Sequence, residues 1–461
     1  MERFLRVHKI SLLLGFIAAL FYASFAYELV RTDFAKLISL YSALFFLSWK
    51  LIQLEQKNFW FLAGAALLLR LVFFGAIPNL SQDFYRFIWD GRMLVSGWNS
   101  YLYLPEILLA EGNTPISQGN LLYEGMGELS AGNYTNYPPL NQLIFALAGL
   151  LAGKSILGSV IVMRIVIIAA DLGVLYFGKK LLEKFDLPGH RIFWYILNPL
   201  VIIELTGNLH FEGVMAFFLV WSLYLLHSRK WILSAIAFAA SVLLKLIPLL
   251  FLPLLLKYFI SDRNDKGKLG LARLMGYYFI VGIVVISGFI PFLSSEFISS
   301  FSSSLGLWFR KFEFNASIYY LVRWVGFQVK GYNIIETAGK ALPLVTVLVL
   351  AGLAFFRENS SLRQLISTML LGITAYFFLA TTVHPWYLMI PLLLSVFTRF
   401  RYMLVWSFLI VLSYYTYSTP EFSENLWLIA FEYLLVFGLF GYELFNFRKE
   451  KVLRGMNYSE E

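Results

Sequence analysis

Long runs of hydrophobic residues, separated by short polar stretches, dominate the chain. A transmembrane helix needs roughly 20 mainly apolar residues, and on that measure the runs accommodate about fourteen spans, some of them short. We place them near residues 10–27, 37–54, 59–77, 157–178, 192–206, 213–228, 231–245, 246–260, 273–293, 338–356, 364–382, 386–398, 402–418 and 426–446. The pattern predicts an all-α polytopic membrane protein, with residues 1–461 forming a single integral membrane domain.

Composition supports this class. The chain is 59% hydrophobic and only 14% charged, whereas soluble domains carry about 25% charged residues. The net charge of +9 would suggest nucleic acid in a soluble protein, but here Lys and Arg are expected to anchor cytoplasmic loops. No nucleic-acid partner is therefore expected. The absence of cysteine excludes disulfides, thiolate catalysis and cysteine-metal sites.

The basic residues also predict an orientation. If the N-terminus is cytoplasmic, most basic clusters fall in cytoplasmic connections and the basic C-terminus is cytoplasmic too. Arg31 and Lys36 run against this trend, because they fall in the first outer loop. Residues 78–156 then form a large extracytoplasmic loop carrying short helices, and residues 294–337 form a second one. Within the first loop, Pro138–Gly153 is short for a span and opens with a Pro-Pro pair, so we expect a re-entrant or interfacial helix.

Four polar clusters fall on the outer face in this topology. They are the segment Ser81–Pro105, Asn208–Glu212, Arg310–Asn315 and His384–Tyr387. Convergence of distant polar turns on one face is what an active site in a helical membrane protein requires.

The first cluster carries the clearest candidate for chemistry. Asp83, Arg86 and Asp90 have the spacing of one helical stripe, so Arg86 and Asp90 could pair with each other. Asp83 would remain beside the membrane, where a lone carboxylate suits a general base for a hydroxyl. The alternative is a helix cap made by Ser81 or Asp83. Arg92, in the same segment, is a candidate for substrate binding.

The second and fourth clusters offer groups that bind sugars. Asn208, His210 and Glu212 suit hydrogen bonds to a polyol, or they satisfy one another as buried polar groups. They are too few to specify a metal site. In the fourth cluster, the His384 imidazole lies beside the rings of Trp386 and Tyr387.

Three cations at the outer membrane surface are candidates for holding a lipid phosphate. They are Lys245, Arg310 and Lys311, since Lys acts as a point charge and Arg as a fork. For Lys245 the alternative is snorkelling to the interface. Inside the bundle, Arg164 and Asp171 lie on one helical face, and we expect them to form a structural ion pair.

Several segments, taken in order, resemble the GT-C glycosyltransferases, in particular the polyprenol-phosphate-mannose-dependent mannosyltransferases. The resemblance extends from about Leu71 to Phe397. The matching pieces are QDFYRFIWDGRMLVSGWNSYLYLP, NYPPLNQLIFAL, NPLVIIELTGNLHFEGVMAFFLVWSLYLL, LLKLIPLLFLPLLL, FEFNASIYYLVR and HPWYLMIPLLL. Two additional spans, 10–27 and 37–54, precede the first loop and leave it on the same side.

The resemblance implies a GT-C-like bundle and a specific reaction. A hexose, with mannose as the expected sugar, would move from a polyprenyl-phosphate carrier to a hydroxyl of a glycan or lipid acceptor, with inversion at the anomeric carbon. The position of the family's base falls on Asp83, and Tyr137 and Asn315 lie in matching segments as substrate-binding candidates. The site would be extracytoplasmic, in a bacterial inner membrane, in contact with membrane lipids. A divalent cation, Mg²⁺ or Mn²⁺, could be shared by carboxylates and phosphate.

Two other classes of function stay open at this point. A flippase or transporter of a lipid-linked or small substrate would also be polytopic and aromatic, but should show midplane polar residues and repeat symmetry. A non-catalytic glycolipid-binding membrane subunit would keep the binding groups and survive loss of Asp83.

Overall fold

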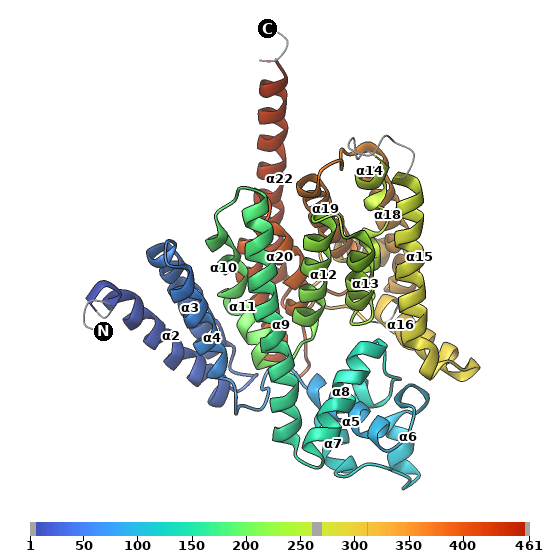
Figure 1. Cartoon of the computed structure of the whole chain (residues 1–461). Helices are drawn as coiled ribbons and strands as arrows, with labels where there is room; N and C mark the ends of the chain where they lie inside the picture. The colour runs from blue at the N-terminus through green and yellow to red at the C-terminus, as the bar shows by residue number, and fades with distance from the viewer. Residues whose placement is uncertain (1–5, 261–269, 311, 457–461) are drawn as a thin grey trace.

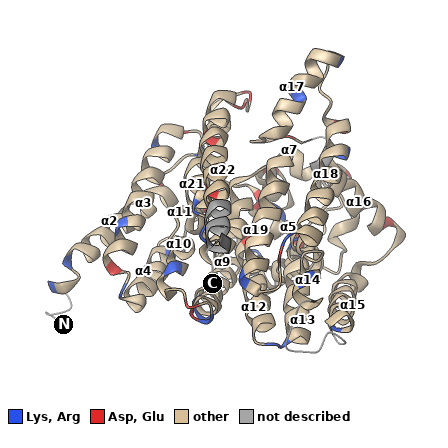
Figure 2. Ribbon diagram, turned by 90° about the horizontal axis from the view of Figure 1, so that it is seen from above, with Lys and Arg blue, Asp and Glu red and all other residues tan. Residues whose placement is uncertain are grey.

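The computed structural model describes residues 6–260, 270–310 and 312–456, with side chains for all of these except 308–310 and 447–456. The described residues form helices and no β-strand, although an isolated bridge joins Phe314 to Thr382. The predicted all-α class is confirmed. In the ribbon of Figure 2, positions of Lys, Arg, Asp and Glu are sparse along these helices, as a lipid environment requires.

Seven helices in the described part are long and apolar enough to cross a membrane. They are α2 (Lys9–Tyr27), α3 (Phe34–Glu55), α9 (Ile156–Lys184), α15 with η5 (Gly270–Phe292), α18 (Ile335–Phe356), α19 (Leu362–Leu379) and α22 (Leu426–Met456, apolar to Asn446). A bent pair, Pro199–Gly207 and Glu212–His227, would make an eighth span. These findings make the chain an integral membrane protein, but with fewer full-length spans than the roughly fourteen that apolar runs alone suggest.

Four shorter apolar helices are also present, and three of them account for remaining predicted spans. They are α4 (Phe59–Leu71), α13 (Trp231–Val242) and the pair η6 and α20 (Pro385–Val396), while the fourth is α8 (Pro139–Ala152). Of these, α8 corresponds to the segment that we expected to be re-entrant or interfacial.

Three predicted spans are not continuous helices. Residues 189–207 form η2 (Gly189–Ile192), α10 (Phe193–Ile196), α11 (Pro199–Val201) and the π-helix η3 (Ile202–Gly207). Residues 247–260 form η4 (Ile247–Phe251) and α14 (Leu255–Ile260), and residues 402–418 form α21 (Tyr402–Leu409) and η7 (Ile410–Ser418). Proline explains the first two breaks, because Pro199, Pro248 and Pro253 lack the amide hydrogen that a continuing helix needs.

The large loop predicted over residues 78–156 folds into short helices. They are α5 (Asp83–Val95), η1 (Ser100–Leu102), α6 (Pro105–Ala110), α7 (Gly119–Ala131) and α8. Figure 1 shows α5 to α8 gathered at one end of the molecule, while the C-terminal end of α22 projects from the opposite end. Helix α9 begins beside α8 and runs towards the other end, so it connects the two.

Two glycines allow α5 and α8 to cross at close range. A Cβ atom added at Gly91 would lie 2.0 Å from the carbonyl oxygen of Phe145, and one at Gly149 would lie 3.1 Å from the carbonyl oxygen of Gly91. No larger residue fits at Gly91 without a shift of backbone. The crossing therefore fixes the start of α5 relative to Tyr137, just before α8.

The expected ion pair between Arg164 and Asp171 is wrong. Asp171 instead accepts a hydrogen bond from Nε of Arg70, on α4, at 2.7 Å. Arg164 donates to the carbonyl oxygens of Thr206 and Gly207 at the end of η3, and to those of Phe74 and Ala76 after α4. Helix ends leave carbonyl groups without intrahelical partners, and the buried Arg164 guanidinium satisfies them.

Candidate active site

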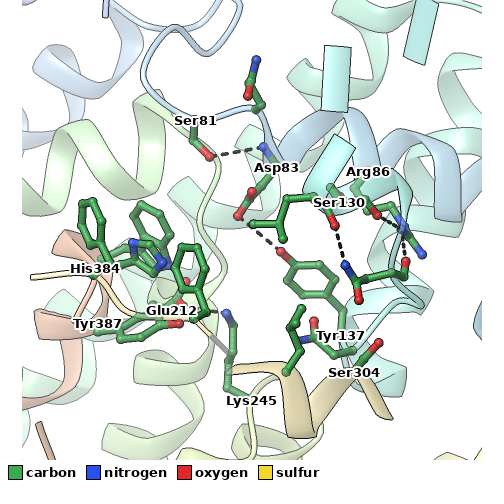
Figure 3. Close-up of a pocket in the computed structure, with 18 of the residues that line it drawn as sticks. Ser81, Asp83, Arg86, Ser130, Tyr137, Glu212, Lys245, Ser304, His384 and Tyr387 are labelled. Atoms are coloured by element: carbon green, nitrogen blue, oxygen red, sulfur yellow. Dashed lines mark hydrogen bonds and ion pairs between the residues drawn. The ribbon is translucent and has the colours of Figure 1, made fainter. Parts of the chain in front are cut away.

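A cavity of about 980 Å³ opens where the short helices of the first loop meet the spans. Its walls come from distant parts of the chain: the α2–α3 turn, the start of α5, the start of α12 (Glu212–His227), and loops after α13, α16 (Ser295–Arg310), α19 and η7. Eight of the predicted site residues line it: Asp83, Arg86, Tyr137, Glu212, Lys245, His384, Trp386 and Tyr387. Figure 3 shows Asp83 and Tyr137 on one side, with His384 and Tyr387 across from them.

Asp83 begins α5, and its carboxylate is left available to the cavity. The N-cap residue of α5 is Gln82, whose side chain makes no capping bond, and the Ser81 Oγ atom accepts from the Asp83 amide at 3.3 Å. The Asp83 Oδ2 atom accepts a hydrogen bond, also 3.3 Å long, from the Tyr137 hydroxyl. Burial raises the pKa of Asp83 above its usual range, while the charge of Lys245 opposes this shift. A partly desolvated carboxylate of this kind has the proton affinity that a general base needs.

Lys245 and Glu212 form an ion pair beside Asp83. The Lys245 Nζ atom lies 2.8 Å from Glu212 Oε1 and 5.4 Å from the centroid of the Tyr137 ring. Lys245 therefore points to a protein partner, and the snorkelling alternative is not what the structure shows. The other oxygen of Glu212, Oε2, is buried and has no hydrogen-bond partner in the described part of the chain.

Three rings form a stack in the wall opposite Asp83. The Trp386 ring lies 3.9 Å from that of His210 and 4.4 Å from that of His384, between centroids, at angles of 12° and 5°. Both faces of Trp386 are covered, so its indole cannot act as a stacking platform for a sugar ring. Burial lowers the pKa of His384 to about 3, helped by the charge of Lys245. At neutral pH, His384 is therefore an uncharged imidazole.

Arg86 and Asp90 form the structural pair that their spacing allowed. Arg86 Nε lies 2.8 Å from Asp90 Oδ1, and Gln142 donates to the other oxygen of Asp90 at 2.9 Å. Arg86 also donates to the carbonyl oxygens of Ser130 and Asn133. Asp90 is fully buried and does not line the cavity. Arg86 does reach the cavity, and its second terminal nitrogen has no partner among the described atoms.

Four further predicted residues lie away from the cavity lining. Arg92 donates to the carbonyl oxygens of Ser117 and Lys154, and Asn208 donates to Glu204. His210 lies 3.5 Å from Glu204 and behind Trp386. Asn315 binds Glu432 and Tyr433 on α22. Their contacts hold loops and helices in place. The side chain of Arg310 and the whole of Lys311 lie outside the described part.

The structure also brings to the cavity residues that the sequence analysis missed. They include Arg31, Glu313, Arg323 and Glu424. The position of Arg31 in an outer loop, against the positive-inside tendency, was the available signal. Glu313 and Arg323 lie in the matching piece FEFNASIYYLVR, and Glu313 also lies in the cluster Arg310–Asn315, but neither was chosen as a site residue. No signal of this kind marked Glu424. Within the described part, no group of three or more His, Cys, Asp or Glu side chains is placed to hold a metal ion.

A comparison with known protein families identifies the family of this chain. Residues 20–261 match the family model described as alpha-(1->6)-mannopyranosyltransferase, N-terminal domain. The chain belongs to this family. It is therefore a membrane glycosyltransferase of the mannosyltransferase type, which acts on a sugar donor and a glycan acceptor, as the sequence resemblance predicted. The match contains Asp83, Tyr137, Glu212 and Lys245. A search of curated proteins found no match.

Proposed function

We propose that this mannosyltransferase moves a mannosyl group from a polyprenyl-phosphate carrier to a hydroxyl of a glycan or lipid acceptor, with Asp83 as the general base. The observation that carries this proposal is the Asp83 carboxylate, which lies in the cavity beside Lys245 and has no cation at ion-pair distance among the described side chains. A base, a cation and a cavity large enough for a sugar are what such a transfer demands.

The proposed step can be written atom by atom. The acceptor hydroxyl gives its proton to an Asp83 carboxylate oxygen while its own oxygen attacks the anomeric carbon of the donor. The bond from that carbon to the phosphate oxygen breaks, and its electron pair leaves with the phosphate. Attack from the face opposite the leaving group inverts the anomeric centre. A β-linked donor then gives an α-linked product, and the family description supports a 1→6 linkage.

The remaining cavity residues serve binding in this proposal. Lys245 stabilises the negative charge that grows on the leaving phosphate, because a fixed cation in a site of low dielectric stabilises developing charge strongly. Glu212 orients Lys245, and its free oxygen accepts a sugar hydroxyl. Arg86, with its unpartnered nitrogen, and Tyr387 provide further polar contacts at the cavity wall. The buried His384 acts as a neutral hydrogen-bonding group.

We also propose that the site faces the extracytoplasmic side of a bacterial inner membrane, with both termini cytoplasmic. Two observations support this. The helices α5 to α8 and the C-terminal end of α22 lie at opposite ends of the molecule (Figure 1), and the basic connections favour a cytoplasmic C-terminus. The short and broken apolar helices complete the predicted crossings in this arrangement.

The test is transfer of radiolabelled mannose from a short-chain polyprenyl-phosphate-mannose by the purified full-length protein. We expect Asp83→Asn to lower transfer by about 10²–10⁴-fold, since that is what a general base contributes. Asp33→Asn is the matched control, because Asp33 caps α3 and does not line the cavity, and Asn caps a helix equally well. Equal transfer by wild type and Asp83→Asn would overturn the assignment of the base.

A further inference from the structure

Arg31 occupies the turn between α2 and α3 and lines the cavity. Its Nη1 atom donates to the carbonyl oxygen of Leu80 over 3.4 Å, and its guanidinium carbon lies 4.2 Å from the centroid of the Tyr417 ring. Leu80 comes directly before Ser81, at the entrance to α5. Arg31 is thus held next to the segment that carries Asp83, near enough for its charge to act on the Asp83 carboxylate.

Arg31 differs from the other described cations of the cavity. These three cations all bind carboxylates, and the pairs are Arg86–Asp90, Lys245–Glu212 and Arg323–Glu313. For Arg31, no carboxylate lies within ion-pair distance in the part of the chain that the structure describes. A guanidinium has five N–H donors, and the long bond to Leu80 uses one of them.

The partly buried guanidinium of Arg31 has no anion among the described residues to compensate its charge. Burial of a charge is costly unless a partner compensates for the lost water, and the Tyr417 ring supplies only a weak interaction of the cation–π type. The anion in the proposed reaction is the phosphate of the donor. Its negative charge increases when the bond to the sugar breaks, because a phosphodiester becomes a phosphate monoester.

We propose that Arg31 binds the phosphate group of the polyprenyl-phosphate donor and of the product that remains after transfer. The inference rests on the proposed function and deepens it, since it adds a residue from the α2–α3 turn to a site otherwise built around α5 and α12. The planar fork of Arg31 would hold two phosphate oxygens, while Lys245 acts from the neighbouring wall as a point charge.

The first experiment measures binding, without turnover. Farnesyl phosphate and farnesol are titrated into the full-length protein in detergent, for wild type, Arg31→Gln and Lys36→Gln. We expect Arg31→Gln to weaken farnesyl phosphate binding by roughly tenfold or more, the effect of losing a charged hydrogen-bond partner, and to leave farnesol binding unchanged. Lys36→Gln removes the same charge from the nearby first turn of α3, but Lys36 does not line the cavity, so binding should stay at the wild-type level.

Three results would overturn the inference. Unchanged binding of farnesyl phosphate to Arg31→Gln would show that Arg31 does not contact the phosphate. Equal loss of farnesol and farnesyl phosphate would show that Arg31 only fastens the α2–α3 turn. Displacement of farnesyl phosphate by phosphatidylglycerol at equal concentration would indicate a general site for anionic lipid headgroups. Arg31→Lys, which keeps the charge and loses the fork, should recover part of the binding.

The same variants separate this inference from the proposed function. In the mannose-transfer assay, Arg31→Gln should lower kcat more than it raises KM, because the phosphate charge is greater in the transition state than in the bound donor. Asp83→Asn should bind farnesyl phosphate at least as well as wild type. If wild type transfers no mannose, yet phosphate binding still depends on Arg31, the proposed reaction fails and the phosphate site stands.

Discussion

At the scale of single residues, partners decide the role of each charged group. Asp83 has a hydroxyl as its neighbour and remains available to the cavity, whereas Asp90 is fixed by Arg86 and Gln142. Both residues belong to the same helical stripe, whose spacing predicted the pairing of Arg86 with Asp90 and left Asp83 as a base or a helix cap. The bonds that hold this pair from outside α5, from Gln142 to Asp90 and from Arg86 to Ser130 and Asn133, depend on contacts between distant residues that spacing along α5 does not contain.

The hydrogen bond from Tyr137 to Asp83 makes the pH profile of transfer testable. Asp83 must be ionised to accept a proton, so activity should fall as pH decreases through its pKa, which burial raises. The Tyr137 hydroxyl stabilises the ionised form and lowers that pKa. In Tyr137→Phe the pKa should rise further, and the acidic limb of the kcat/KM profile should move to higher pH.

The control for this shift is Tyr27→Phe. The hydroxyl of Tyr27 binds the carbonyl oxygen of Val72, outside the cavity lining, so its loss should leave the acidic limb where it is in wild type. Movement of the limb to lower pH in Tyr137→Phe would contradict the assigned hydrogen bond.

At the scale of elements, the crossing of α5 and α8 positions Asp83, the proposed base. Hydropathy predicted that the segment around α8 is too short for a normal span, and Pro-Pro marked its start. It did not predict the partner of α8, because a glycine that permits close approach looks the same in sequence as one in a turn.

Broken spans were missed for a related reason: apolar composition persists across residues 192–206 and 246–260, although proline interrupts the helical hydrogen bonds there.

The crossing predicts that Gly91→Ala damages both stability and activity. Its Cβ would lie 2.0 Å from the Phe145 carbonyl oxygen, so α5 and α8 must move apart. Overpacking of this kind costs about 1–3 kcal/mol, which thermal unfolding in detergent would record as a lower Tm. Transfer should fall as well, because Asp83 and Tyr137 flank the crossing.

Gly352→Ala provides the comparison, since a Cβ at Gly352 in α18 meets nothing within 4 Å. This variant should keep the wild-type Tm. A Gly91→Ala protein as stable and active as wild type would show that the two helices tolerate a wider separation.

At the scale of the whole molecule, the sequence was most informative about class and family. The ordered segments from the first outer loop to His384 predicted a mannosyltransferase, and the family match confirms this. The sequence was less informative about the cavity as a whole. Glu313 and Arg323, in the matching piece FEFNASIYYLVR, and Glu424, just before α22, reach it through the folding of distant segments, which the sequence of each segment alone does not reveal.

The cysteine-free chain makes the proposed orientation directly measurable. A single cysteine placed at the exposed Asn113, between α6 and α7, should react with a membrane-impermeant maleimide added to intact cells. One placed at the exposed Lys184, at the end of α9, should react only after the membrane is permeabilised. The opposite pattern would place the cavity on the cytoplasmic side and exclude the proposed topology.

The division of the cavity walls between two parts of the chain has an evolutionary consequence. The part that matches the family model contains Arg31, Asp83 and Lys245, while His384 and Arg323 lie beyond it. Substitutions in the second part would alter the shape of the space that receives substrates and leave the proposed base, Asp83, in place. We therefore expect changes confined to the C-terminal half to alter which acceptor is used more than whether transfer occurs.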